Sequence, residues 1–311
     1  MKKIISSMVA TSLLLGGCSD MTDNHSTNES QNQKETKSIP EKMPAQEYTG
    51  QGFQPDATNE AIKFAKKHRK EFEKVGEQFF KDNFSLNVKA TNVVGSGDGV
   101  EVFVHCKDND IVFNSSIVLD KESINQTGSM RSTDTSGDME MAVGNVLSGF
   151  EYRGQKEKYD NLTQFYKDNE QKYNYTGFTK KAINNTQNGG YQNEYYYLAV
   201  NLTSIQNYRK YYEPLIHKND REFKLGLEKA KYELNNQGKN DVVSTLFSTQ
   251  KDPSKKELFK SVYTMANNIE NNKNMPKKTR ITTQLGDKYI STKKAFYTEK
   301  DTADYGSFDE E

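Results

Sequence analysis

The segment from Met1 to Cys18 constrains this chain more than any other part of its sequence. Two lysines are followed by the apolar run Ile4–Leu15, and then by a short Leu-Gly-Gly-Cys sequence that ends at Cys18. A positive end followed by about a dozen apolar residues is typical of an export signal, and it is too short to span a bilayer, which takes about 20 residues. We therefore expect residues 1–17 to be removed and the remaining chain to fold outside the membrane.

The end of this segment resembles a bacterial lipobox, because a leucine and two small residues lead directly into a cysteine. The resemblance implies that the Cys18 thiol receives a diacylglyceryl group and that cleavage falls between Gly17 and Cys18. Two acyl chains hold a protein on a bilayer, whereas one chain holds it only marginally. The alternative is a plain secretory signal with an incidental cysteine. We predict a lipoprotein whose partner is the membrane, reached through the anchor on Cys18.

The composition predicts a folded protein without disulfide bonds. Removal of Lys2 and Lys3 with the signal leaves 41 of the 43 basic residues against 43 acidic ones, a balance that argues against nucleic-acid binding. The chain has only 33% hydrophobic residues, but its 18 tyrosines and 16 phenylalanines can bury a large area. Cys106 is the only other cysteine, so an acylated Cys18 leaves it no partner within the chain.

Changes in composition predict the organisation of the chain. Residues 18–55 are expected to be the lipidated cysteine and a flexible linker, because residues 24–37 contain no apolar side chain. Within this stretch Tyr48–Phe53 is either an aromatic segment laid along the fold, as we favour, or more of the linker. We expect a helix-plus-sheet unit over 56–150, a helix-rich unit over 151–298 and a frayed tail over 299–311.

The first unit has the clearest pattern. Apolar residues at helical spacing predict a helix over 57–82, capped by Asp56 or Thr58. Alternating residues and turn sequences then predict three antiparallel strands, 86–94, 100–106 and 111–119. The arrangement is similar to cystatin-like folds, an analogy that does not give a function. The polar side of the helix is basic, with lysines at 63, 66, 67, 70 and 74. It either contacts an anionic polymer or lipid or, as we favour, is a solvated face interleaved with glutamates.

The second unit is expected to be mostly helical, and the fold class is α+β. Spacing predicts helices around 139–150 and 156–166, a short helix over 178–186, and three more that begin near Ser204, Asp220 and Leu258. A strand is predicted over Tyr191–Val200. The segments Arg280–Leu285 and Lys288–Thr292 are predicted to form a terminal hairpin.

No residue pattern indicates catalysis, a cofactor or a metal. His105 and Cys106 are neighbours on a strand, so their side chains point to opposite faces and cannot form a dyad. Cys106 alternates with three valines and is interpreted as a core residue. The four histidines are too scattered for a zinc site, and no P-loop, dinucleotide or serine-hydrolase motif is present. We therefore assign no catalytic, cofactor-binding or metal residue.

Tyrosines gather in the second half of the chain. They could form a platform on which glycan rings stack, or they could pack through their rings in the core. Glycan sites usually include tryptophan, and the chain has none. Both interpretations stay open for the tyrosines at 173, 175, 191, 195, 196, 197, 208, 211 and 212.

Several segments resemble a family of uncharacterised staphylococcal lipoproteins, a family built on a domain of unknown function. The resemblance rests on Met1–Lys3, Leu14–Asp20, Glu47–Phe53, Leu147–Arg153 and Tyr208–Ile216. It implies a lipid anchor at Cys18 on the extracellular face of a Gram-positive cell membrane, and it implies no activity. We expect a non-enzymatic binding module whose further partner is a cell-wall glycan or a protein. The alternatives are a cell-envelope hydrolase and a substrate-binding lipoprotein for import.

Overall fold

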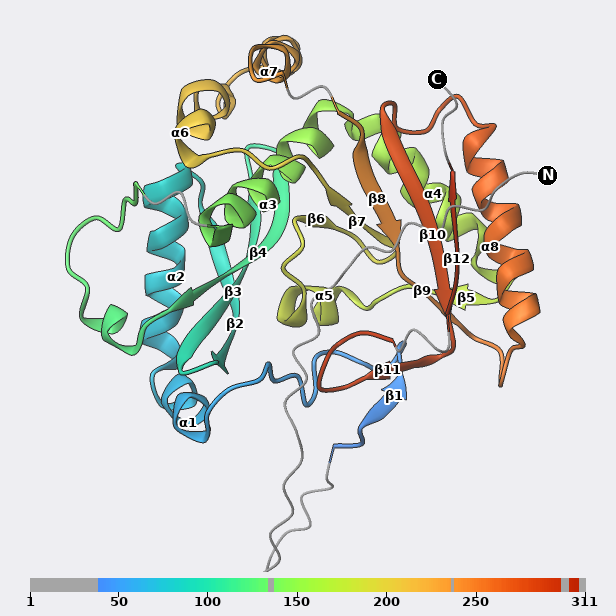
Figure 1. The fold of residues 1–311 in the computed structure, drawn as a ribbon, viewed down its shortest axis with the longest axis horizontal. Helices are drawn as coiled ribbons and strands as arrows, with labels where there is room; N and C mark the ends of the chain where they lie inside the picture. Colours follow the sequence, from blue (N-terminus) through green and yellow to red (C-terminus); the bar gives the residue numbers. More distant parts are fainter. Residues whose placement is uncertain (1–38, 134–136, 236–237, 298–301, 308–311) are drawn as a thin grey trace, which may run out of the picture. The chain divides into compact units, whose positions relative to one another are not determined.

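The amphipathic pattern after residue 56 gives two helices rather than one. The computed structural model describes residues 39–133, 137–235, 238–297 and 302–307, and within it α1 (Asn59–Lys67) and α2 (Arg69–Phe84) meet at His68 (Figure 1). The prediction of a single helix over 57–82 is therefore wrong at His68, where the backbone leaves helical geometry with φ −110° and ψ 27°. Thr58 caps α1 as predicted, since its hydroxyl accepts a hydrogen bond from the Ala61 amide.

The predicted three-stranded meander is confirmed. Strands β2 (Val88–Ser96), β3 (Gly99–Asp108) and β4 (Ile111–Leu119) pair antiparallel in that order. The tight turn into β4 is made by Asn109 and Asp110, which both adopt positive φ. Helix α2 packs on one face of the meander, and the close approach needs a glycine: a Cβ at Gly76 would lie 2.6 Å from Val102.

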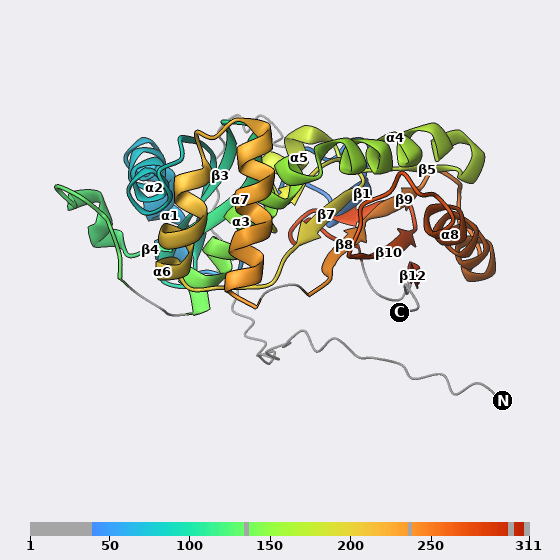
Figure 2. The same cartoon turned by 90° about the horizontal axis from the view of Figure 1, so that it is seen from above.

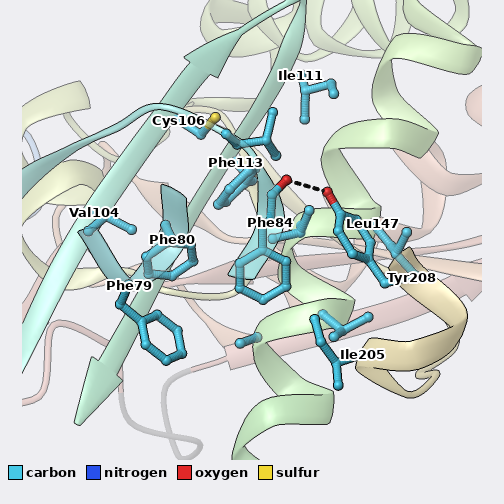
Figure 3. Packing of buried hydrophobic residues seen from close by; sticks show 14 of the residues in the cluster. Phe79, Phe80, Phe84, Val104, Cys106, Ile111, Phe113, Leu147, Ile205 and Tyr208 are labelled. Atoms are coloured by element: carbon cyan, nitrogen blue, oxygen red, sulfur yellow. Dashed lines mark hydrogen bonds between the residues drawn. The ribbon is translucent and has the colours of Figure 1, made fainter. Parts of the chain in front are cut away.

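The core beside this meander is rich in aromatic side chains (Figure 3). Helix α3 (Gly137–Gly154) packs against β4, and its Phe150 meets Tyr208 from a later part of the chain. Tyr208 lies in a π-helical turn, Tyr208–Tyr212, which follows the short helix α6 (Ile205–Asn207) and precedes α7 (Asp220–Glu233). This core therefore takes side chains from both sides of residue 150, the boundary expected between the two units.

The second half contains a mixed sheet that the sequence analysis largely missed. Its strand order is β5-β9-β10-β8-β7-β6, and β12 pairs with β10 beside this path. Strands β8 and β9 run parallel to β10, and the other pairs are antiparallel. The strands are β5 (Tyr175–Thr176), β6 (Tyr191–Gln192), β7 (Tyr196–Ala199), β8 (Asn240–Ser244), β9 (Leu246–Ser248), β10 (Thr279–Gly286) and β12 (Thr302–Ser307). The α+β class is confirmed, but this half holds more strand than expected.

Three pairings differ from expectation. The segment 191–200 is a hairpin, because the Asn193 side chain accepts hydrogen bonds from the amides of Tyr195 and Tyr196 and turns the chain. The expected terminal hairpin does not form, since β11 (Tyr289–Ser291) pairs with β1 (Lys42–Pro44) and β10 pairs with β12. Strand β12 lies within residues 299–311, where we expected a frayed tail.

Helices α4 (Lys156–Tyr173) and α8 (Lys255–Glu270) share one hydrophobic cluster with the mixed sheet (Figure 2). On β10 the buried side chains Ile281, Thr283 and Leu285 alternate with less buried ones. The hydroxyls of Tyr166 from α4 and Thr283 lie 3.1 Å apart and share a hydrogen bond. Ser254 and Glu257 form a capping box at the start of α8.

The segment before residue 56 lies along the fold from Ile39 onward. Tyr48 is fully buried and its hydroxyl donates to the Thr292 carbonyl over 2.9 Å. It belongs to a small cluster with Phe178 and residues of the short helix α5 (Lys180–Thr186). Residues 39–55, expected within the linker, are thus part of the body, and Tyr48–Phe53 is the aromatic segment that the sequence analysis placed along it. Ile39–Glu311 groups as one compact unit.

No helix in the described part of the chain is both long enough and apolar enough to cross a membrane. Gly17, Cys18 and the linker up to Ser38 lie outside the described residues.

Candidate functional site

The tyrosine clusters of the second half belong mainly to the core. Six of the nine tyrosines considered for a glycan platform are buried and the other three are half-buried. Their hydroxyls bond inside the protein: Tyr175 donates to the Tyr166 carbonyl and Tyr196 to the Tyr159 carbonyl. Burial raises the pKa of Tyr166 to about 12. These clusters therefore stabilise the fold and offer no stacking platform.

Two exposed aromatic rings gather elsewhere, on α8 beside β12. Phe259 and Tyr263 are 49% and 46% exposed, and Tyr305 of β12 is half-buried beside them. The ring centres of Tyr263 and Tyr305 are 5.0 Å apart, and those of Phe259 and Tyr305 are 6.3 Å apart, both edge to face. Each ring supports the other two, so the three hold a defined surface. We call Phe259, Tyr263 and Tyr305 the aromatic patch.

Helix α8 places the aromatic patch on the flank away from α4. Leu258 and Val262 face the sheet and are buried. At about 100° per residue, Phe259 and Tyr263 follow them round one side of the helix. The opposite flank, with Ser261 and Thr264, borders α4. The aromatic patch therefore lies on the side of α8 next to β12, at the edge of the sheet (Figure 2).

In the described part of the chain, β12 is an edge strand next to this patch. Among the described residues it pairs only with β10, from Thr302↔Gly286 to Ser307↔Ile281. An edge strand presents unpaired amide and carbonyl groups that another strand can use. Lys256 and Lys260 are exposed on the same helix, and Lys260 also lines the groove between α8 and α4. Ring faces, a strand edge and positive charge thus lie together.

A cluster of large exposed aromatic side chains indicates a contact surface. Single exposed apolar residues are normal on proteins, whereas a grouped set rimmed by polar residues marks an interaction site. Sequence spacing does not reveal the patch, because Phe259 directly follows Leu258 within the apolar pattern that predicts this helix. Whether Phe259 is exposed depends on which side of α8 the sheet covers, and the spacing of apolar residues does not show that.

The expected core role of Cys106 agrees with its surroundings. Cys106 is fully buried, and burial, with a smaller contribution from Asp108, raises the pKa of its thiol to about 12. His105 lies on the other face of β3, where its Nδ1 is 3.1 Å from the Asn114 side-chain oxygen. The two side chains do not come together, as the strand spacing predicted.

One cavity holds a buried acid–base pair. It has a volume of about 500 Å³ and lies between the end of α3, α7 and the start of β8, with Glu151, Gln155, Lys231 and Asn240 in its lining. One Glu151 oxygen accepts from Gln155 over 2.7 Å, and the other accepts from Lys231 over 2.6 Å. Each oxygen of the Glu151 carboxylate is thus held by one side chain of the protein.

A second groove, of about 300 Å³, separates the end of α4 from α8. Its only carboxylate belongs to Glu257, which accepts hydrogen bonds from the hydroxyl and amide of Ser254. The Ser254 hydroxyl, and then its amide, hold the pKa of Glu257 below its usual value. This group caps α8. Among the described residues, no group of three or more His, Cys, Asp or Glu side chains could hold a metal ion.

Fold and surface define an α+β body with an exposed aromatic patch. The chain belongs to the DUF1672 family, described as a protein of unknown function, whose model matches residues 35–311. It is similar to a DUF1672 family protein from Staphylococcus aureus subsp. aureus Mu50 whose crystal structure is known. The two are 48% identical with a TM-score of 0.84, over 88% of this chain and 100% of that chain. No curated protein matches the chain. The expected family membership is confirmed.

Proposed function

We propose that this protein is a lipid-anchored binding module that holds an extended segment of a partner protein against α8 and β12. The observation that carries the proposal is the aromatic patch beside the open edge of β12. The anchor part rests on the sequence alone, in which a signal-like apolar run ends in Gly17-Cys18. Two acyl chains on Cys18 would hold the body outside the membrane without a spanning helix.

Strand addition gives such a site both affinity and selectivity. A segment that pairs with β12 satisfies amide and carbonyl groups along its backbone, so binding depends little on its sequence. Alternate side chains of that segment point toward the side of the sheet that α8 covers, where Tyr305 and Tyr263 lie. Aromatic rings supply much contact area for little lost freedom, so they favour apolar side chains at these positions. Lys256 and Lys260 favour an acidic residue at the rim.

The alternatives have less support. A glycan could stack on Phe259 and Tyr263, whose rings are 21° from parallel, but stacking would leave the β12 edge unused. An envelope hydrolase would need an acid or base poised for a substrate, whereas the Glu151 carboxylate is held by Gln155 and Lys231 of the protein itself. An import receptor would need two lobes around a cleft, whereas Ile39–Glu311 groups as one unit.

The binding proposal is tested with a displayed library of extended peptides selected on the body, residues 39–311. Tyr263→Ser should weaken binding of the selected peptides by about tenfold or more, as for a central aromatic contact. Tyr232→Ser is the matched control, because Tyr232 is 72% exposed on another helix, α7, and should change nothing. Hydrogen exchange should also slow at the β12 amides when peptide is bound.

Equal losses in both variants, or unchanged exchange in β12, would count against strand addition. Peptidoglycan fragments serve as the second probe. If they bind and Phe259→Ser abolishes that binding while no peptide is selected, the patch is a glycan site instead.

The anchor is tested separately with Cys18→Ala in cells. We expect loss of the acylated form, altered processing and release from the membrane fraction. Unchanged mobility and unchanged membrane retention would refute lipidation at Cys18.

A further inference from the structure

A second surface, made only of lysines, lies where α1 meets α2. Lys63, Lys66, Lys67, Lys70 and Lys74 are all exposed, and none forms an ion pair among the described residues. We call these five the basic surface. A shallow hollow of about 550 Å³ runs through it, lined by Lys66, Lys67, Arg69, Lys70, Glu71 and Lys74.

Two of the three nearby glutamates of α2, Glu73 and Glu77, are engaged with other groups, and Glu71 lines the hollow. Glu73 pairs with Arg69 over 2.9 Å, and Glu71 lies 3.7 Å from His68. Glu77 accepts a hydrogen bond from the Ala90 amide over 3.0 Å. The expected interleaving of lysines with glutamates therefore holds in sequence, but the glutamates do not pair with the lysines of the basic surface.

The bend at His68 gives this surface its shape. A single straight helix would spread the five lysines along about 16 Å of one side. The bend instead joins the last turn of α1, with Lys66 and Lys67, to the first turns of α2, with Lys70 and Lys74. The result is a concave group of positive charges, which is the shape that receives headgroups or other bulky anions.

The basic surface lies near the point where the body begins. A Cβ at Gly52 would lie 3.1 Å from the Ile39 side chain, so Ile39, the first described residue, lies against Gly52. Seven residues, at most about 25 Å of chain, separate Gly52 from the start of α1 at Asn59. Figure 1 shows helix α1 and strand β1 along the lower edge of the body, with α1 at the left and β1 nearer the strands of the mixed sheet.

The chain between Cys18 and this point is long enough to bring the basic surface to a membrane. About 20 residues separate the predicted anchor from Ile39, and a chain of that length can reach at most about 70 Å when extended. An anchored body therefore stays within reach of the headgroups, and attraction between lysines and anionic lipid acts over the Debye length of about 8 Å at physiological salt.

We propose that the basic surface docks the body on anionic phospholipid headgroups and so orients it on the membrane. Docking strengthens the attachment that the proposed lipid anchor on Cys18 provides. Its role in the cell therefore rests on the proposed function of a lipid-anchored binding module. The docked orientation turns α8 and β12 away from the lipid, because they lie at the far end of the body from α1 (Figure 1). The aromatic patch then remains accessible to its partner.

The test measures docking without the anchor. Ile39–Glu311 groups as one compact unit, and the crystallised relative corresponds to 88% of this chain, so the body is expected to fold alone. The body is mixed with vesicles of phosphatidylcholine, with or without phosphatidylglycerol, and sedimented. We expect binding only to the anionic vesicles, weakening steeply as salt rises.

The decisive variant replaces Lys66, Lys67, Lys70 and Lys74 by glutamine. Because each lysine near an anionic surface contributes roughly a fivefold gain, the variant should bind at least about a hundredfold more weakly. The control replaces four other exposed lysines, Lys181, Lys218, Lys224 and Lys229, by glutamine and changes the net charge equally. The control should keep most of the binding, and circular dichroism should show both variants folded.

Three results would overturn the proposal. The first is that the body binds neutral vesicles as tightly as anionic ones. The second is that the two lysine variants lose the same amount of vesicle binding. The third is that the body binds soluble polyphosphate but does not bind anionic vesicles. The last result would make the basic surface a site for a phosphate polymer. Since the body carries no lipid, none of these results depends on whether Cys18 is acylated.

Discussion

Tyr208 offers the sharpest test that the tyrosine-rich second half is core. Its side chain is fully buried, and its hydroxyl donates to the carbonyl of Phe84 over 2.8 Å (Figure 3). Phe84 is the last residue of α2, where carbonyl groups have no partner within the helix. Tyr208→Phe keeps the ring, which lies 5.3 Å from Phe84 and 5.9 Å from Phe150, and removes only this hydrogen bond.

The loss of stability depends on the Phe84 carbonyl, which Tyr208→Phe leaves buried without its donor. A typical buried hydrogen bond contributes about 1 kcal/mol net, and a buried carbonyl without a partner costs about 1–3 kcal/mol. We therefore expect the free energy of unfolding to fall by about 1–3 kcal/mol. For a body of this size that corresponds to a fall in Tm of about 2–4 °C per kcal/mol. Burial, and then Glu213, raise the pKa of Tyr208 well above its ordinary value, so the hydroxyl stays a donor at neutral pH.

Urea unfolding followed by circular dichroism measures this difference directly. Tyr232→Phe is the control, because Tyr232 is 72% exposed and should shift stability by no more than about 0.5 kcal/mol. The reasoning would be refuted if Tyr208→Phe were as stable as the parent protein. It would also be refuted if both variants lost the same amount, since burial would then not distinguish the two tyrosines.

Three further outcomes are expected from the first sheet. Gly76→Ala should cost about 1–3 kcal/mol in a urea titration, because its Cβ would lie 2.6 Å from Val102. Burial, only partly offset by hydrogen bonds such as that from Ser116, raises the pKa of Glu101, so the folded state binds its proton more tightly than the unfolded state. Stability should therefore fall as pH rises from 4.5 through the raised pKa of Glu101, and Glu101→Gln should reduce this dependence in unfolding curves taken at several pH values. Cys106, whose pKa is raised to about 12, should react with a thiol reagent at pH 8 only after denaturant is added, and prompt reaction of the folded protein would contradict its burial.

The local elements of the first half could be predicted because short-range patterns determine them. Val100, Val102, Val104 and Cys106 alternate on one face of β3, and the turn at Asn109 fixes its pairing with β4. The bend at His68 could not be predicted, since no proline or glycine marks it. It follows from the need of α1 and α2 to pack on different parts of a twisted sheet.

The mixed sheet could not be predicted because its pairings join distant segments. Strands β8 and β9 are short, and they pair with β10, which begins about 40 residues later. Strand β12 follows a stretch of polar composition, and only its pairing with β10 makes it a strand. The same sheet decides that Leu258 is buried and that Phe259 is exposed. The aromatic patch therefore exists only at the tertiary level, and tyrosine-rich segments in the sequence pointed to the core instead.

The two proposed surfaces lead to a final prediction about their independence. The basic surface lies on α1 and α2, and the aromatic patch lies on α8 and β12 at the other end of the body (Figures 1 and 2). The helices that carry them belong to different hydrophobic clusters, which meet at Val200, so we expect little coupling between the two surfaces. Combining Tyr263→Ser with the four-lysine variant should reproduce each single loss, peptide binding and vesicle binding, within about 0.5 kcal/mol of additivity. A peptide that competes with anionic vesicles for the body would instead mean that the two sites are coupled, and the docked orientation would then hide the patch from its partner.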